Sequence, residues 1–226
     1  MRGPAQPWRF RHLVLVVAAL ALAAWAGYRF ALRDHIRPRN FGTVTDGHVY
    51  RSAALTPAAL KRVHTRHGVR TLIDLGGFDR DPAGARVQAR TAEALGIRRV
   101  VLPLEGDGTG NPNAYVAALR LLADPAAHPV LVHCASGAQR TGACVILYRH
   151  ILQGQAIAEA YPEAFAYGHD PGDNWKLMAY LADWAGPIAR AVRERGWVEG
   201  FPPVSEDEHL AGATPERRAA EASTAR

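Results

Sequence analysis

The chain has 226 residues, a hydrophobic content of 48% and a formal net charge of +6. This length fits one domain with appendages, and the hydrophobic content is sufficient for a packed core, which excludes a wholly disordered chain. Its two cysteines exclude a disulfide framework, and no platform of aromatic and basic residues accompanies the positive charge, so nucleic-acid binding is not predicted.

Residues 1–39 are predicted to be a separate unit that starts with a basic segment, which contains Arg2, Arg9, Arg11 and His12. The uncharged run that follows, residues 13–28, would rise about 24 Å as a helix, which is less than the ~30 Å hydrocarbon core of a bilayer. The span becomes sufficient if Arg29 extends toward the interface and the apolar stretch continues to residue 32. We therefore expect an uncleaved single-pass anchor over residues 13–32 in a membrane, most simply a bacterial inner membrane.

The alternative for this segment is a cleaved signal peptide. Ala21-Leu22-Ala23 and Ala24-Trp25-Ala26 both fit a signal-peptidase site behind a basic region. Cleavage there would give a secreted or periplasmic protein. Arginines flank the apolar run on both sides, so the orientation of an anchor is left open.

From residue 40 onward, the hydrophobic periodicity predicts strands that alternate with helices. Strands are predicted at residues 43–51, 71–75, 98–104 and 130–133. Helices are predicted at residues 56–68, 82–95, 113–122, 140–152, 157–167 and 173–195. This order indicates an α/β fold with a mostly parallel central sheet and helices on both faces. Residues 40–200 would form the main folded domain, and residues 201–226, with Pro202-Pro203 and mixed charges, are predicted to be a disordered tail.

The most informative segment runs from His133 through Cys134 to Arg140, Thr141 and Gly142. It lies between a predicted buried strand and a predicted helix. Such a turn directs backbone N–H groups inward, and the helix N-terminus adds partial positive charge, so the loop can bind a dianion. Its substrate-binding residues would be Ala135, Ser136, Gly137, Ala138, Gln139 and Arg140.

Each conspicuous side chain of this segment suits phosphate chemistry. Arg140 can bind two phosphoryl oxygens with its planar guanidinium. Cys134, as a thiolate favoured by the cationic surroundings, can attack phosphorus and form a phosphocysteine. Thr141 can donate its hydroxyl to the sulfur, and His133 can hold the loop backbone. Cys144, on the core-facing side of the next helix, is predicted to be an apolar filler.

The order His-Cys-x5-Arg-Thr resembles the signature loop of the cysteine-dependent protein tyrosine and dual-specificity phosphatases. The segment 40–53, which contains Tyr50-Arg51-Ser52, and the strand 69–75 look like the opening of compact bacterial and fungal members of that family. The resemblance covers about residues 40–185. It implies Cys134 as nucleophile, Arg140 as phosphate clamp and Thr141 as helper in breaking the intermediate, with neither cofactor nor metal.

The resemblance also implies an acidic residue on a mobile loop that protonates the leaving oxygen. Asp107, between two glycines after the strand 98–104, is the first choice, and Glu105 is the alternative general acid. Asp79 and Asp81 rank after these two as general acids and are expected to cap the following helix. Asp74, inside a strand, is expected to be a structural hydrogen-bonding residue.

Three functions remain open from the sequence. The first is a phosphatase of protein phosphotyrosine, with phosphoserine and phosphothreonine as further substrates. The second is a phosphatase of inositol phosphates, phosphoinositides or phosphatidylglycerophosphate, which is disfavoured because Ala135, Ala138 and Gln139 put no cation inside the loop. The third is a phosphate-binding module without catalysis, which would not need the thiol. A sulfur transferase of the rhodanese type fits the His-Cys opening and the trailing Arg-Thr-Gly poorly.

Overall fold

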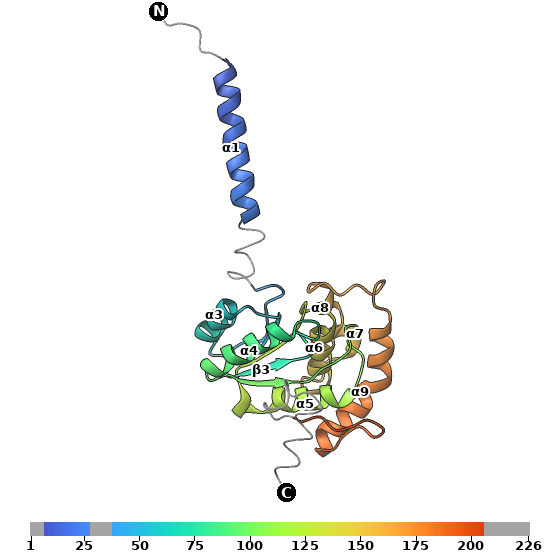
Figure 1. The fold of residues 1–226 in the computed structure, drawn as a ribbon. Helices are drawn as coiled ribbons and strands as arrows, with labels where there is room; N and C mark the ends of the chain where they lie inside the picture. Colours follow the sequence, from blue (N-terminus) through green and yellow to red (C-terminus); the bar gives the residue numbers. More distant parts are fainter. Residues whose placement is uncertain (1–6, 28–37, 206–226) are drawn as a thin grey trace, which may run out of the picture.

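Figure 1 shows the computed structural model, which describes residues 7–27 and 38–205. Within these residues, five strands form one sheet in the order β1-β2-β5-β3-β4. Their bounds are Gly42–Thr45 (β1), Val49–Ala53 (β2), Thr71–Asp74 (β3), Arg98–Val101 (β4) and Val130–Cys134 (β5). Strand β1 pairs with β2 in antiparallel fashion, and all other pairs are parallel. The predicted mostly parallel sheet is confirmed.

Helices cover both faces of the sheet. After helix α1 (Pro7–Gly27) come α3 (Pro57–His67), α4 (Pro82–Ala94), α5 (Pro112–Ala123), the 3-10 helix η2 (Pro125–Ala127), α6 (Gln139–Ile151), α7 (Ile157–Ala160), α8 (Pro162–Phe165) and α9 (Lys176–Glu194). On one face, Leu60 of α3 belongs to a buried cluster with Leu72 and Leu131. On the other face, Leu119 of α5 and Ile146 of α6 share a core with Val132. Figure 1 accordingly shows β3 between α4 and α5.

Local sequence signals account for the ends of several elements. Thr56 caps α3, because its side chain accepts a hydrogen bond from the Ala59 N–H at 3.3 Å, and Pro57 occupies the first turn. Gly68 ends this helix in the left-handed conformation, with φ of 66°. Strand β4 ends at Val101 rather than at residue 104, and Pro103, which has no N–H to donate, lies just beyond it.

The region after α6 is less regular than predicted. The single helix expected over residues 157–167 is two short helices, α7 and α8, and Pro162 opens the second of them. The helix expected to begin at residue 173 begins at Lys176. Both regions still lie on the α6 side of the sheet, since Ala160, Ala164 and Leu181 join the core there.

The N-terminal segment forms helix α1 (Pro7–Gly27). Across the described residues, no helix is long and apolar enough to cross a membrane. Helix α1 contains Arg9 and Arg11, and its uncharged run, residues 13–27, rises only about 22 Å. The predicted anchor over residues 13–32 and the localisation to a membrane are therefore wrong. Arg29, on which the longer span depended, lies outside the described residues, as do residues 206–226 of the predicted disordered tail.

Candidate active site

The loop of residues 134–140, which we call the signature loop, connects the carboxyl end of β5 to the N-terminus of α6. Its turn depends on Gly137, which has φ of 73°. A Cβ at this position would lie 2.6 Å from the backbone nitrogen of Ala53, which belongs to the neighbouring strand β2. Only glycine fits this combination of left-handed backbone and close approach.

We expect Gly137→Ala to lower the stability of the protein and to displace the signature loop. The left-handed conformation costs about 1–3 kcal/mol for a residue with a side chain, and the contact with β2 adds to it. Thermal unfolding and the binding of inorganic phosphate measure the two effects. Gly47→Ala is the matched control, because Gly47 has φ of 71° but no described residue lies within 4 Å of where its Cβ would be. If both variants bind phosphate equally well, the loop does not depend on Gly137.

The carbonyl groups of the signature loop are held from outside by residues far away in sequence. The oxygens of Ala135, Ser136 and Gly137 accept hydrogen bonds from the Ala54 N–H at 3.3 Å, Asn40 Nδ2 at 2.8 Å and Arg51 Nη2 at 3.0 Å, respectively. In a trans peptide the N–H points opposite to the C=O. The N–H groups that follow these three carbonyls therefore point to the opposite side, as in an anion-binding nest. One of them, the Ala138 N–H, also contacts Ser136 Oγ at 3.4 Å.

Cys134 ends strand β5 and is 1% exposed. Two hydrogen-bond donors in the first turn of α6, Arg140 Nε and Thr141 Oγ1, are buried and have no partner among the residues that the structure describes. A buried donor without a partner costs about 1–3 kcal/mol, so each of these groups would gain from an acceptor placed over the loop. A Cβ on Gly142 would lie 3.6 Å from that of Ala164, which is an ordinary van der Waals distance.

The guanidinium of Arg140 is held through a single nitrogen. Its Nη1 donates to the carbonyl oxygens of Gly76 at 2.5 Å and Leu104 at 3.2 Å. The same nitrogen forms an ion pair with the half-exposed carboxylate of Asp79 at 2.5 Å. The expectation that Asp79 caps a helix is therefore wrong, because its carboxylate reaches the arginine instead.

The other acidic residues near β3 have the structural roles expected of them. Asp81 caps α4 by accepting the Gly84 N–H at 2.9 Å. The buried Asp74 accepts the Gly77 N–H and pairs with Arg99 at 2.5 Å. These contacts orient the loop that carries Asp79.

His133 and Cys144 lie in the core. Burial lowers the pKa of His133, and the Asp74 carboxylate, whose Oδ1 lies 4.0 Å from His133 Nε2, only partly opposes this, so the imidazole is neutral at physiological pH. Burial raises the pKa of the Cys144 thiol to about 12. Cys144 is therefore an unreactive core residue, as predicted, and Cys134 is the thiol that lies in the loop.

The loop of residues 105–110, which we call the acid loop, carries both candidate general acids. Asp107 accepts hydrogen bonds from the Thr109 N–H at 3.0 Å and from Thr109 Oγ1 at 2.7 Å, and Lys176 Nζ lies 3.9 Å away. Burial acts to raise the pKa of Asp107, but the Thr109 hydrogen bonds and the Lys176 charge outweigh it and lower the pKa. Glu105 is exposed. The Asp107 carboxyl is thus ionised at neutral pH when no phosphate is bound.

A side-chain bridge fastens the acid loop to the signature loop. Asn174 Nδ2 donates to the Asp107 carbonyl at 2.6 Å and to Gln139 Oε1 at 3.0 Å. The same Gln139 oxygen pairs with His169 Nδ1 at 2.6 Å. A Cβ at Gly108 would lie 3.3 Å from the Gln139 carbonyl oxygen. The structure therefore brings together the two loops that the sequence analysis selected separately.

Four residues that support these loops were missed by the sequence analysis: Asn40, Arg51, His169 and Asn174. Each is separated from its contact in the signature loop by at least 30 residues. A sequence signal existed only for Arg51, a charged residue in the middle of a buried strand.

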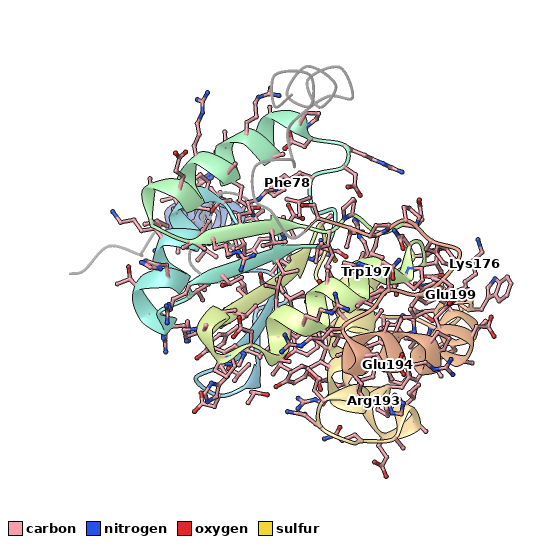
Figure 2. All side chains as sticks on the ribbon, turned by 90° about the horizontal axis from the view of Figure 1, so that it is seen from below. Phe78, Lys176, Arg193, Glu194, Trp197 and Glu199 are labelled. Atoms are coloured by element: carbon pink, nitrogen blue, oxygen red, sulfur yellow. The ribbon has the colours of Figure 1, made fainter. Side chains whose placement is uncertain are left out.

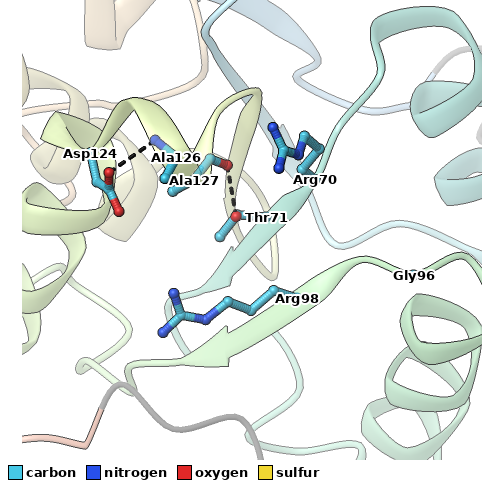
Figure 3. Close-up of a pocket in the computed structure, with 7 residues that line it drawn as sticks. All are labelled: Arg70, Thr71, Gly96, Arg98, Asp124, Ala126 and Ala127. Carbon is cyan, nitrogen blue, oxygen red and sulfur yellow. Dashed lines mark hydrogen bonds between the residues drawn. The ribbon is translucent and has the colours of Figure 1, made fainter.

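A cavity of about 290 Å³ lies elsewhere in the domain (Figure 3). It is lined by Arg70 and Thr71 at the start of β3 and by Gly96 and Arg98 at the start of β4, together with Asp124, Ala126 and Ala127. The signature loop follows the carboxyl end of β5, whereas this cavity lies at the amino ends of the parallel strands β3 and β4. The cavity and the signature loop are therefore at opposite ends of these strands. In the part of the chain that the structure describes, no cluster of histidine, cysteine and acidic side chains could hold a metal ion.

The fold and the loop define a cysteine-dependent phosphatase of the tyrosine and dual-specificity type. Residues 31–176 match the sequence profile of a family described as a DSP-PTPase phosphatase fused to NAD+ kinase. Because this match covers more than half of the 226 residues, the chain belongs to that phosphatase family. A search of curated proteins found no match.

Solved structures share the same fold. The core catalytic domain of the PP-IP phosphatase Siw14 from S. cerevisiae aligns with a TM-score of 0.55 at 21% identity, covering 70% of this chain and 94% of the Siw14 chain. TpbA from P. aeruginosa aligns with a TM-score of 0.54 at 26% identity, covering 69% of this chain and 91% of its own. A cysteine-to-serine variant of TpbA, 24% identical, was crystallised in complex with pTyr, with coverage of 68% and 90% and a TM-score of 0.54. The predicted family and enzyme class are confirmed.

Proposed function

We propose that this phosphatase hydrolyses phosphotyrosine in proteins through a phosphocysteine at Cys134, and that residues 40–200 form its catalytic domain. The observation that carries the proposal is a pair of buried donors, Arg140 Nε and Thr141 Oγ1, that have no partner among the described residues. They lie beside a loop in which the three consecutive carbonyls of residues 135–137 are held from outside. A phosphate dianion over the loop would accept from these donors and from the loop N–H groups.

The proposed reaction has two steps. In the first, Cys134 Sγ attacks phosphorus, the bond from phosphorus to the leaving oxygen breaks, and the Asp107 carboxyl gives its proton to that oxygen. In the second, Asp107 takes a proton from water as the water oxygen attacks phosphorus, and the phosphorus–sulfur bond breaks. Arg140 holds the phosphoryl oxygens throughout, and Thr141 Oγ1 donates to the departing sulfur.

This mechanism requires Asp107 to be protonated when the substrate is bound, although its pKa is lowered in the free protein. A bound phosphate dianion supplies the change, because a nearby negative charge favours the protonated form of a carboxylate. The side-chain bridge through Asn174 supports this role, since it keeps the acid loop next to the signature loop.

The choice of phosphotyrosine rests on the interior of the signature loop. Ala135, Ser136, Ala138 and Gln139 carry no positive charge, and Arg140 is the cation that the loop itself contributes. A substrate with several phosphates would need more cations at this position. A single phosphate on an aromatic leaving group suits the loop best.

A substrate panel tests this proposal with the full chain. We expect the highest kcat/KM with phosphotyrosyl peptides, a lower value with phosphoseryl peptides, and the lowest values with inositol polyphosphates and phosphatidylglycerophosphate. Release of inorganic phosphate measures all four on one scale. A preference for inositol polyphosphates over phosphotyrosyl peptides would contradict the proposed substrate while leaving the phosphocysteine mechanism intact.

A further inference from the structure

A second arginine is buried behind the signature loop. Arg51, in the middle of β2, has no exposed side-chain surface. The nearest carboxylate described, that of Glu163, lies 3.7 Å from Arg51 Nη1, which is too far for a hydrogen bond. Glu163 is also paired more closely with Arg149, at 2.9 Å, so this long ion pair neutralises the buried charge of Arg51 only in part, and a further anion nearby would stabilise it.

The sheet places this cation on the same side as the proposed nucleophile. In the parallel ladder between β2 and β5, Ala53 pairs with Cys134 and Arg51 pairs with Val132. Side chains two positions apart in a strand point to the same face, so Arg51 and Cys134 share a face of the sheet. Burial lowers the pKa of Arg51, whereas anionic Tyr167, Glu163 and Cys134 would act to raise it, in this order of size.

The contacts of Arg51 leave part of its hydrogen-bonding capacity unused. Nη2 donates to the Gly137 carbonyl at 3.0 Å, and the guanidinium carbon lies 3.6 Å from the centroid of the Tyr167 ring. Nε and Nη1 are buried and have no hydrogen-bond partner within residues 7–27 and 38–205. Tyr167 packs directly against Gly42 of β1, since a Cβ on Gly42 would lie 2.0 Å from the Tyr167 hydroxyl oxygen. The tyrosine therefore shields the guanidinium from water, which strengthens its field at the loop.

We propose that Arg51 is a positioning residue and the second positive charge of the phosphate site. Its hydrogen bond orients the Gly137 peptide, and its charge stabilises the Cys134 thiolate and the bound phosphate from behind the loop. This inference deepens the proposed function and rests on it, since it requires Cys134 to act as a thiolate.

Two substitutions separate the charge from the hydrogen bond. Arg51→Gln removes the charge and keeps an amide that can donate to Gly137, whereas Arg51→Lys keeps the charge. The readout is the rate at which iodoacetamide alkylates Cys134 at one mildly acidic pH, with the modified peptide identified by mass spectrometry. We expect Arg51→Gln to slow alkylation about tenfold and to weaken protection by inorganic phosphate by a similar factor, while Arg51→Lys retains most of both.

Arg120→Gln is the matched control. Arg120 also stacks on an aromatic ring, 4.6 Å from the centroid of Trp197 (labelled in Figure 2), and also donates to backbone carbonyls, those of Ala191 and Gly196. Arg120 lies between α5 and α9, and its described contacts are all with residues 191–197, not with the signature loop. Its loss is expected to lower the melting temperature but to leave the alkylation of Cys134 unchanged.

The outcomes distinguish this inference from the proposed function. If the wild-type Cys134 is not alkylated faster than an ordinary thiol and phosphate does not protect it, the proposed function fails. If wild-type Cys134 is reactive and protected but folded Arg51→Gln behaves identically, only the role of Arg51 is overturned. Circular dichroism establishes folding in each case.

A second variant decides the question if Arg51→Gln does not fold. Glu163 is about one-quarter exposed, lies near Arg51 and also pairs with Arg149 at 2.9 Å. The double substitution Glu163→Gln with Arg149→Gln removes one charge of each sign, so the net charge is unchanged. It frees Arg51 from the opposing carboxylate, and we expect faster alkylation of Cys134. An unchanged or slower rate overturns the proposal.

Discussion

Cys134→Ser is expected to abolish turnover of an aryl phosphate while the protein stays folded. The serine hydroxyl has nearly the same size as the thiol, but it remains protonated near neutral pH, so the loop would hold a phosphate over a group that cannot attack it. Sulfur is the nucleophile that the loop provides, because its remaining side chains are alanine, serine, glutamine and arginine. Hydrolysis of a nitrophenyl phosphate, followed beside thermal unfolding, measures both parts of the expectation.

Cys144→Ala provides the control for this substitution. Cys144 is fully buried on α6, and burial raises its pKa to about 12, so it takes no part in the chemistry. Its loss should lower stability by the cost of a small cavity and preserve kcat. Activity of Cys134→Ser close to that of the wild type would exclude the phosphocysteine mechanism altogether.

The signature loop could be predicted from the sequence because its chemistry is local. A nucleophile, a clamp and a glycine turn must lie within seven consecutive residues, and the apolar runs on either side identify the strand and the helix. The parallel sheet could be predicted for the same reason, since each strand and helix is marked by its own periodicity and caps. Both features use information that a short stretch of chain contains.

The supports of the loop could not be predicted in this way. Arg51 contacts Gly137 across 86 positions and Asn40 contacts Ser136 across 96, so the fold alone brings them together. Asp79 is a further example, because its contact is also with a residue distant in sequence. Its position before a helix suggested a cap, but Asp81 has that role, and Asp79 reaches Arg140, 61 positions away.

Asp107→Asn is expected to slow the enzyme in proportion to how poor the leaving group is. General acid catalysis contributes ~10²–10⁴-fold, so hydrolysis of a phosphotyrosyl peptide or an alkyl phosphate should fall by about this factor. An activated nitrophenyl ester, whose leaving group departs readily as the anion, should be slowed less. The basic limb of the pH–rate profile should flatten, because the group that must stay protonated is gone. Steady-state kinetics with both leaving groups measure the difference.

Glu105→Gln is the matched control, since Glu105 is exposed on the same loop and the structure gives its carboxylate no hydrogen bond. It should leave both substrates and the pH profile nearly unchanged. If the two variants exchange behaviours, Glu105 is the general acid and Asp107 serves only to shape the turn through Thr109. If both leave the profile unchanged, Asp79 becomes the residue to substitute, because its carboxylate already lies at Arg140. An unchanged profile in both variants would also be explained by a leaving group that needs no proton. A phosphoanhydride substrate has such a group, because its leaving phosphate is stable as an anion.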